Sequence, residues 1–498
     1  MMEGLVPQIP IIVICSSLIG AFLSPVLGRI RPGAVGLMSR IILPANSILL
    51  FVLLAAVNAG QSFEYHMGGW APPWGIALSV DYLSLLLTIT IQLVAAIILF
   101  YAERDLFHEV RADLHRWYYT LFLLLVGSMT ALGFSHDFFN IFVFTEISTI
   151  AACAIIAIKP ERECVEASFK YVILSTVGSG FILLSLALVY MVTGQFNLPL
   201  IAEAMPVAVA AYPLNIMAAL ALLIVGFGVK SALFPLHVWL PDAHSSAPTP
   251  SSAVLSGLVV KVYAVVLIRL IFTVFGREIF ATAPVADVLL VISATAILAG
   301  SLFAIAQREI KRMLAFSTVA QVGYIYMGVS LMSEAGATGG LVHVFNHALM
   351  KTLLFLAAGA LIYQTGLRRI ADLDGIARRM PITMVAFGIG ALSMVGIPGF
   401  NGFVSKMHLA LGAFEAGRPA FVVVILLSSL LNGIYYLPIV LRAFFGDSET
   451  EMAFTIDRLP LSMLAPLVIL GLACIYFGLL PGSLLGLARR AATYLLTI

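Results

Sequence analysis

The sequence predicts an all-α polytopic membrane protein of about fourteen transmembrane helices, and three observations support this fold class. First, 61% of the 498 residues are hydrophobic and 10% are charged, whereas soluble domains are about 45–50% apolar and about 25% charged. Second, apolar stretches of about 20 residues, enough to span a bilayer, follow one another along the chain. Third, prolines and glycines interrupt two of these stretches, which is typical of the broken helices of transporters.

The first span begins without a basic segment, so we expect a retained helix rather than a cleaved signal peptide. Windows of apolar residues then predict the remaining helices in order. The spans lie at about 5–28, 36–59, 80–102, 116–134, 137–158, 166–193, 212–234, 250–275, 284–306, 311–332, 337–363, 381–414, 420–445 and 461–481, and a short amphipathic tail follows. Little of the chain is left for a soluble domain.

Basic residues in the loops predict the orientation, because cytoplasmic loops carry an excess of lysine and arginine. With the N-terminus outside, the inner loops hold most of the basic loop residues, among them Arg29, Arg104, Arg162, Arg308, Arg312, Arg368 and Arg378. The outer loops and the tail hold Arg277, Arg418, Arg489 and Arg490. We therefore expect a multi-pass protein of the cytoplasmic membrane with both termini on the non-cytoplasmic side.

The seventh and twelfth spans carry the two predicted breaks. A proline-rich run from Pro235 to Pro250 follows the seventh span, and the sequence GIPGFNGFVSK interrupts the twelfth. An offset of five spans reverses the direction of a helix, so these breaks predict two five-helix repeats of inverted topology. The chain then divides into an N-terminal three-helix segment (1–110), a first repeat with helices 4–8 (116–275), a second repeat with helices 9–13 (284–445), and a C-terminal helix and tail (446–498).

Charged residues inside the spans are the candidate functional groups. The chain has few lysines, yet four of them, Lys230, Lys261, Lys351 and Lys406, fall inside predicted spans. A lysine in hydrocarbon costs a few kcal/mol, so such residues usually face the protein interior and have a function there. Glu146 lies near the middle of the fifth span and is a natural counter-ion for one of them.

The segment from Lys230 to Lys261 contains FPLHVWLPDAHSSAPTP followed by SGLVVK. It resembles the signature of the antiporter-like proton-translocating subunits of respiratory complex I, membrane-bound hydrogenases and Mrp-type cation/proton antiporters. A weaker resemblance covers about Trp70 to Arg442. The resemblance implies that Glu146, Lys230, Lys261 and Lys406 translocate protons, and that His343, His347 and Lys351 line the path between the two halves. Lysine at position 406 is similar to the Mrp D-like and hydrogenase pattern, whereas one complex I paralogue carries glutamate there.

These residue types suggest a mechanism. Burial disfavours a charged ammonium, and a neighbouring carboxylate favours it. We therefore expect Lys230 to hold its proton while it is paired with Glu146 and to release the proton when the pair separates. In this hypothesis Lys261 is the relay and Lys406 is the outlet of the second half-channel.

Each assignment has a structural alternative. Glu146 and Lys230 could form a static ion pair that fixes helix register. Lys261 and Lys406 could extend toward helix ends to reach the headgroups. His343 and His347 share one helix face with Lys351 at a spacing of four residues, and they suit either a wet relay or hydrogen bonding between helices. The spacing lacks the acidic residue of an HExxH motif, so no metal is expected there.

The first break carries His237, Asp242 and His244, which could form a cytoplasmic proton entrance. Helix capping is the alternative, because Thr249 and Pro250 read as an N-cap followed by a proline at the first helical position. Asp81, at the start of the third span, fits the family pattern and also an N-terminal cap. We expect Arg269 to meet lipid headgroups rather than the ion path.

Three functions remain open. The first is an ion-translocating subunit of a multi-subunit cation/proton antiporter, closest to the Mrp D subunit, with other antiporter-type membrane subunits as partners. The second is the same module in a redox-driven complex, a complex I-like dehydrogenase or a membrane-bound hydrogenase. The third is a structural or quinone-binding subunit, which four intramembrane lysines disfavour. We expect no cofactor, metal or redox centre in this chain, because it has no phosphate loop and its four cysteines form no CxxC.

Overall fold

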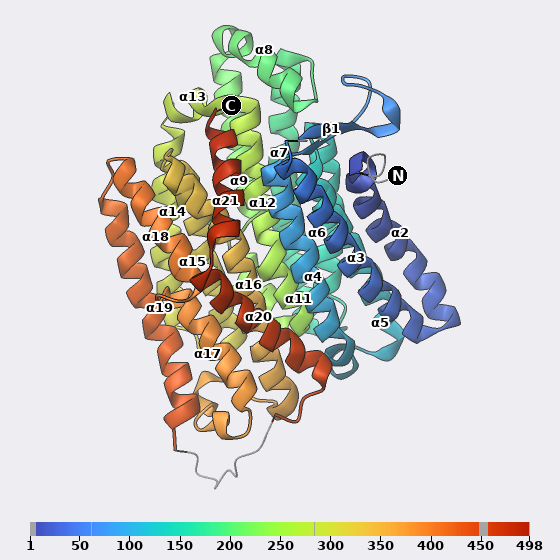
Figure 1. The fold of residues 1–498 in the computed structure, drawn as a ribbon, viewed down its shortest axis with the longest axis vertical. Coiled ribbons are helices and arrows are strands. Elements are labelled where there is room, and N and C mark those ends of the chain that lie inside the picture. The colour runs from blue at the N-terminus through green and yellow to red at the C-terminus, as the bar shows by residue number, and fades with distance from the viewer. Residues whose placement is uncertain (1–5, 61, 283, 448–456, 498) are drawn as a thin grey trace.

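The computed structural model describes residues 6–60, 62–282, 284–447 and 457–497. The chain folds into a bundle of long helices that run close to one common direction (Figure 1). The first half contains α2 (Ile9–Ile30), α3 (Pro32–Asn58), β1 (Phe63–His66), β2 (Ala77–Val80), α4 (Tyr82–Glu109), α5 (His115–Phe134), α6 (Phe138–Ile156), α7 (Arg162–Thr193), α8 (Leu198–Ala211), α9 (Pro213–Lys230), α10 (Trp239–Ser246), α11 (Thr249–Val254) and α12 (Val260–Leu270).

The second half continues the bundle. It contains α13 (Gly276–Thr282), α14 (Val285–Ile305), α15 (Ile310–Ser330), α16 (Glu334–Thr365), α17 (Pro381–Val395), α18 (Asn401–Glu415), α19 (Ala420–Phe445), α20 (Leu461–Leu479) and α21 (Gly482–Thr497). Short π-helical turns, Leu255–Val259 and Ile271–Phe275, extend α11 and α12 into one helical rod from Thr249 to Phe275, and Gly276, with a φ of 78°, separates this rod from α13.

The predicted fold class is confirmed. In the described part of the chain, thirteen helices are long and apolar enough to cross a membrane. The shorter α17 and α18 form the broken twelfth span, which brings the number of crossings to the predicted fourteen. Most bounds agree with the sequence prediction to within several residues. The main exception is α4, which continues to Glu109, beyond its predicted end at 102.

Both predicted breaks are present. The first follows Lys230, the last residue of α9, and α10 begins only at Trp239. Pro235 lies in this interval and has no amide hydrogen to continue a helix. The second break lies between α17 and α18, where Gly396 ends the helix with a φ of 88°. This left-handed cap favours glycine because a side chain would strain it.

The centre of the bundle is formed by three segments. The most apolar windows of Thr249–Ala281 and Glu334–Thr365 are entirely buried, and that of α15 is 94% buried. The corresponding windows of the first two helices and of α20 are only 33% buried, so these helices lie at the periphery. Side chains on the central segments therefore face protein on every side, and their polar groups must find partners inside the bundle.

The end of the bundle that carries both chain termini has additional structure (Figure 1). Strands β1 and β2 form an antiparallel hairpin in which Phe63 pairs with Val80. The short helix α8 lies at the same end. Neither element was predicted. The predicted amphipathic tail is α21, which buries Leu484, Ala488 and Leu495 and exposes Arg489.

Candidate functional site

The first cluster joins α6 to the end of α9. The ammonium of Lys230 donates to Oε1 of Glu146 at 3.1 Å and to Oγ1 of Thr149 at 2.8 Å. Lys230 is fully buried, whereas the side chain of Glu146 is 32% exposed on the flank of the isolated chain. The hydroxyl of Ser179 also donates to Glu146. The expected pairing of Glu146 with Lys230 is therefore present, and it lies where the first break begins.

Tyr263 connects this pair to the central rod. Its hydroxyl lies 2.9 Å from Ser148 Oγ and 3.1 Å from Thr149 Oγ1. Its ring centroid lies 5.9 Å from the ammonium of Lys230, within the range of a cation–π contact. Tyr263 follows Lys261 by two residues in α12. Sequence reasoning did not single it out, because tyrosine in an apolar span usually reads as packing.

Lys261 lies at the centre of the bundle and is 1% exposed. Its ammonium donates to the carbonyl of Ser256, one helical turn earlier, inside the first π-helical turn. A π-helical turn disturbs the regular hydrogen-bond ladder and is frequent at functional sites. Lys261 therefore bonds to backbone inside the protein, and its side chain does not extend to the headgroups.

His343, His347 and Lys351 lie on one face of α16, as their spacing predicted. The two imidazole rings stack with centroids 5.4 Å apart and an interplanar angle of 10°. Nδ1 of His343 lies 2.9 Å from Ser405 Oγ, while His343 Nε2 and both nitrogens of His347 have no hydrogen-bond partner among the described residues. Lys351 donates to the Leu314 carbonyl at 2.7 Å and contacts the Ser317 and Tyr436 hydroxyls.

Lys406 lies at the second break and is 5% exposed. Its ammonium donates to the carbonyls of Met394 at 2.9 Å and Val395 at 3.0 Å, the last residues of α17. The final carbonyls of a helix have no intrahelical partner and carry the negative end of its dipole, so they attract a cation. Ser429 accepts a third hydrogen bond at 3.0 Å. The break thus builds the binding site for the ammonium.

These groups form one electrostatic row through the bundle. The charge of Lys261 acts on His343, His347 and Lys351. The charge of Lys406 also acts on His343, whose Nδ1 contacts Ser405, the residue before Lys406. The row therefore runs from the second break, through the histidine pair, to Lys261 and Lys351 in the central helices.

The histidines of the first break have different environments. His244 is fully buried beside Phe355, and in the described structure neither of its ring nitrogens has a hydrogen-bond partner. The charges of Lys351, Lys311 and Lys261 act on it, so it extends the row. His237 instead lies among Phe234, Phe303 and Phe316, with ring centroids 5.3–6.2 Å away.

Asp242, the third candidate in this segment, lies nearer the surface. It pairs with Lys170 at 3.1 Å and with Arg312 at 3.2 Å. The three side chains are 29–48% exposed, so these ion pairs contribute little to stability. They line a polar recess at the end of the bundle opposite the termini.

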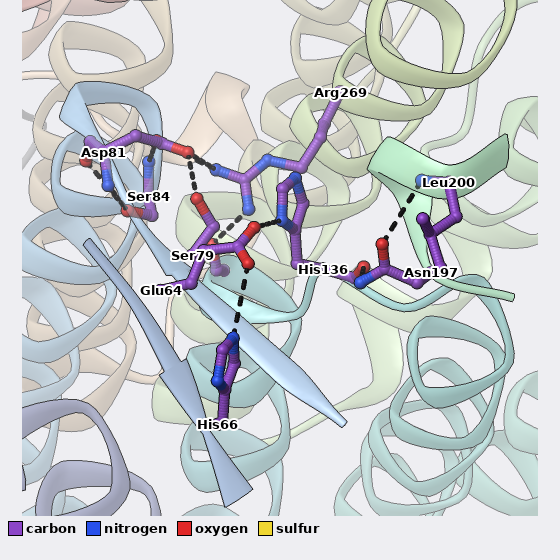
Figure 2. A network of polar contacts seen from close by, with 10 residues as sticks. Glu64, His66, Ser79, Asp81, Ser84, His136, Asn197, Leu200 and Arg269 are labelled. Atoms are coloured by element: carbon purple, nitrogen blue, oxygen red, sulfur yellow. Dashed lines mark hydrogen bonds and ion pairs between the residues drawn. The ribbon is translucent and has the colours of Figure 1, made fainter. Parts of the chain in front are cut away.

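Figure 2 shows the polar network at the end with the hairpin. Arg269 donates to both carboxyl oxygens of Asp81 at 3.1 Å and to the Gly133 carbonyl at 2.9 Å. Arg269 is 5% exposed, so the expectation that it meets headgroups was wrong. Its partner lies 188 residues away in sequence. Asp81 also accepts the amide hydrogen of Ser84 at 2.6 Å, as the predicted N-cap of α4.

Sequence reasoning missed a second charged cluster. Asp105, Lys159 and Lys311 are buried, and the side chain of Glu109 is 11% exposed, near the ends of α4, α6 and α15 that lie opposite the chain termini. The predicted third span ends at 102, which leaves Asp105 and Glu109 outside the predicted spans. The spacing of Asp105 and Glu109, four residues on one helix face, is the signal that could have identified them.

Most of the chain matches proteins of one family. Residues 135–432 match a family described as NADH:quinone oxidoreductase/Mrp antiporter, TM. The chain is 37% identical over 488 residues to the N subunit of an NADH-quinone oxidoreductase from Desulforudis audaxviator, covering 95% of this chain and 96% of the relative. It is 28% identical over 435 residues to the D subunit of a Na(+)/H(+) antiporter from Alkalihalophilus pseudofirmus, covering 86% of each.

Two solved structures have a similar fold. A chain of the archaeal membrane-bound sulfane sulfur reductase, a respiratory membrane complex, matches with a TM-score of 0.90 and 29% identity, covering 98% of both chains. A chain of the Mrp complex from Dietzia sp. matches with a TM-score of 0.89 and 26% identity, covering 99% of this chain and 98% of the other. A respiratory complex and an Mrp complex thus both contain similar chains.

Proposed function

We propose that this chain, which belongs to the NADH:quinone oxidoreductase/Mrp antiporter transmembrane family, translocates protons. It does so as one subunit of a membrane complex. The complex is a monovalent cation/proton antiporter of the Mrp type. Other antiporter-type membrane subunits are the partners, and both termini lie on the non-cytoplasmic side. The two halves, 116–275 and 284–445, each contribute one half-channel.

The contact between Lys230 and Glu146 is the observation that carries this proposal. It unites a buried ammonium with a carboxylate that lies on the flank of the bundle, at a helix end where the backbone is already broken. A hydrogen bond to a charged group contributes about 1.5–3 kcal/mol. Moving one charge through 100 mV costs about 2.3 kcal/mol. The free energy of breaking and forming this contact is therefore similar to the free energy needed to move a proton against a membrane potential.

Lys230 releases its proton when Glu146 moves away and regains one when the pair forms again. Lys261 relays the proton to the histidine pair, and Lys406 is the outlet of the second half-channel. A static ion pair would not explain the unpartnered histidine nitrogens of α16. Buried polar groups without hydrogen-bond partners cost free energy of folding. The unpartnered nitrogens therefore favour a path over a structural role.

The second candidate is the same module in a redox-driven complex, and the similarity to the N subunit of an NADH-quinone oxidoreductase favours it. Redox centres would then belong to partner subunits. Purification of the native complex and mass identification of its subunits separates the two candidates. Small antiporter subunits alone indicate the Mrp type, and iron–sulfur or nickel-site proteins indicate the redox type.

Transport by the complex in proteoliposomes tests the shared mechanism. Lys230→Ala and Glu146→Ala should each abolish proton movement while the subunit still assembles. Glu203→Ala, on the exposed side of α8, is the control and should transport normally. Normal proton movement by the Lys230 and Glu146 variants would overturn the assignment.

A further inference from the structure

The end of α4 opposite the termini carries two carboxyl groups one helical turn apart. Glu109 is the outer one, and its Oε1 accepts hydrogen bonds from the amide of Thr249 at 3.0 Å and from its hydroxyl at 2.7 Å. Asp105 is one turn deeper and 1% exposed, and neither of its carboxyl oxygens has a hydrogen-bond partner in the described structure. Leaving a buried carboxyl group unpaired costs free energy, so packing alone does not explain Asp105.

Charged and titratable groups surround Asp105 on each helix packed against it. On α4 they are Glu109 and Tyr101; the other elements contribute Lys311 at the start of α15, Lys159 after α6, and Tyr118 on α5. Lys159 lies 3.4 Å from Glu109 Oε2. The hydroxyl of Tyr118 is fully buried and, within the described residues, has no hydrogen-bond partner either. Two acids, two ammonium groups and an unsatisfied hydroxyl thus share one buried site.

This site is joined to the first helix break at two points. Glu109 binds the amide of Thr249, the first residue of α11. Lys311 donates to the carbonyl of Ala247, the residue after α10, at 2.8 Å. The charge of Lys311 also acts on His244 of α10, and so do the charges of Lys351 and Lys261. Lys311 therefore lies between the acid pair and the buried row.

An open, polar recess of about 280 Å³ lies near the site, because its lining includes Ser246 and Arg312, the chain neighbours of Ala247 and Lys311. Its lining includes Asp242, Arg312 and Arg368, and the charge of Arg368 acts on Lys311. Lys159 reaches a second exposed group, Glu161, at 3.5 Å. Through Lys159 and the exposed Glu161, the acid pair is thus connected to the surface at this end of the bundle. Through Lys311 it is connected to the lysine and histidine row at the centre.

We propose that Asp105 and Glu109 form the proton-loading site on the inner side, and that Lys311 and His244 pass the proton on to Lys351 and Lys261. This inference rests on the proposed function. The Asp105 carboxyl binds a proton that arrives from the surface past Glu161, Lys159 and Glu109, and then gives it up toward Lys311 and His244. His244 accepts a proton on one ring nitrogen and releases one from the other, so no group keeps a net change in charge.

The test measures proton uptake from the inner side by the whole complex in oriented vesicles, over a range of inner pH. Asp105→Asn keeps the shape of the side chain but cannot carry a proton, and uptake should fall by about 10²-fold. Asp105→Glu should restore most of the rate, because it returns a titratable carboxyl group. Glu103→Gln on the same helix is the matched control, since Glu103 pairs with Arg40 away from the site.

His244→Gln provides a second arm, because His244 has no hydrogen-bond partner in the described residues whose loss would unfold the chain. This variant should also slow uptake, even if Asp105→Asn fails to assemble. Normal uptake in His244→Gln, or in an assembled Asp105→Asn, would overturn the inference. If Lys230→Ala loses transport while His244→Gln and Asp105→Asn keep it, the inference fails and the proposed function stands. If the wild-type complex moves no protons, the proposed function itself fails.

Discussion

The ammonium of Lys230 lies 2.8 Å from Thr149 Oγ1 and 3.1 Å from Glu146 Oε1, so two residues one helical turn apart on α6 hold it. Lys230 is also the last residue of α9. A movement of the first break therefore pulls directly on this contact. The neutral hydroxyl of Thr149 can keep the ammonium in place when the carboxylate leaves.

Replacing Thr149 by valine should therefore lower the transport rate without abolishing it. The shapes of the two side chains are similar, but the hydrogen bond to the ammonium is lost, at a cost of about 1.5–3 kcal/mol. Proton flux in proteoliposomes is the measurement. Ser148→Ala is the control, since Ser148 contacts Tyr263 rather than Lys230. Equal rates in the two variants would show that Thr149 does not hold the ammonium.

Gly396→Ala should destabilise the second break. The residue has a φ of 88°, and an added Cβ would lie 2.9 Å from Lys406 Cδ. A left-handed conformation costs an alanine about 1–2 kcal/mol, and the contact would displace Lys406 from the carbonyls of α17. Thermal unfolding and transport should both decline. Gly388→Ala in the same helix is the control, because its nearest neighbour would lie 3.8 Å away. An unchanged Gly396→Ala variant would contradict the geometry of the cap.

Arg269→Ala should be strongly destabilising. It leaves Asp81, whose side chain is only 14% exposed, without its ion-pair partner, and removal of one member of a buried pair costs about 3–5 kcal/mol. The double variant with Asp81→Asn should recover part of this loss. Arg418→Ala is the control, because its ion pair with Asp287 is exposed and worth at most about 1 kcal/mol. Unfolding in detergent provides the comparison, and equal losses for Arg269→Ala and Arg418→Ala would refute a buried pair.

The attachment of the β1–β2 hairpin should weaken in acid. A hydrogen bond with His136, at 2.7 Å, lowers the pKa of the Glu64 carboxyl below its ordinary value of 4.5. A group with a lowered pKa in the folded state contributes stability above its ordinary pKa and loses it as the pH falls through the folded value. Hydrogen exchange of β1 should therefore accelerate below about pH 4.5. Glu64→Gln should remove this dependence, and a pH profile identical to that of wild type would exclude Glu64.

Hydropathy predicted the spans and both breaks because bilayer thickness fixes helix length, and because proline and glycine leave recognisable gaps. It missed α8 and the hairpin, which are too short to give a periodic signal. It also ended α4 too early. Polar residues after Phe100 resemble a loop, but α4 stays helical to Glu109 because neighbouring helices bury Asp105.

The candidate site was predicted in part. The cost of burying charge identified Lys230, Lys261, Lys351 and Lys406 without any structure. Their partners could not be predicted, because the carbonyls of Ser256, Leu314 and Met394 become available only through the way the helices end and cross. Arg269 shows the same limit, since its counter-ion lies on a helix near the start of the chain.

The two π-helical turns that flank α12 give the central rod an adjustable register. Each π-helical turn contains one residue more than an α-helical turn. The position of the π-helical turn along the helix shifts when one amide hydrogen changes from one carbonyl acceptor to the next. Each step of this kind rotates the intervening side chains about the helix axis without unwinding the rod. Lys261 is bonded to a carbonyl within one of these turns. Its side chain can therefore rotate about the helix axis and face different neighbours while the surrounding helices keep their positions.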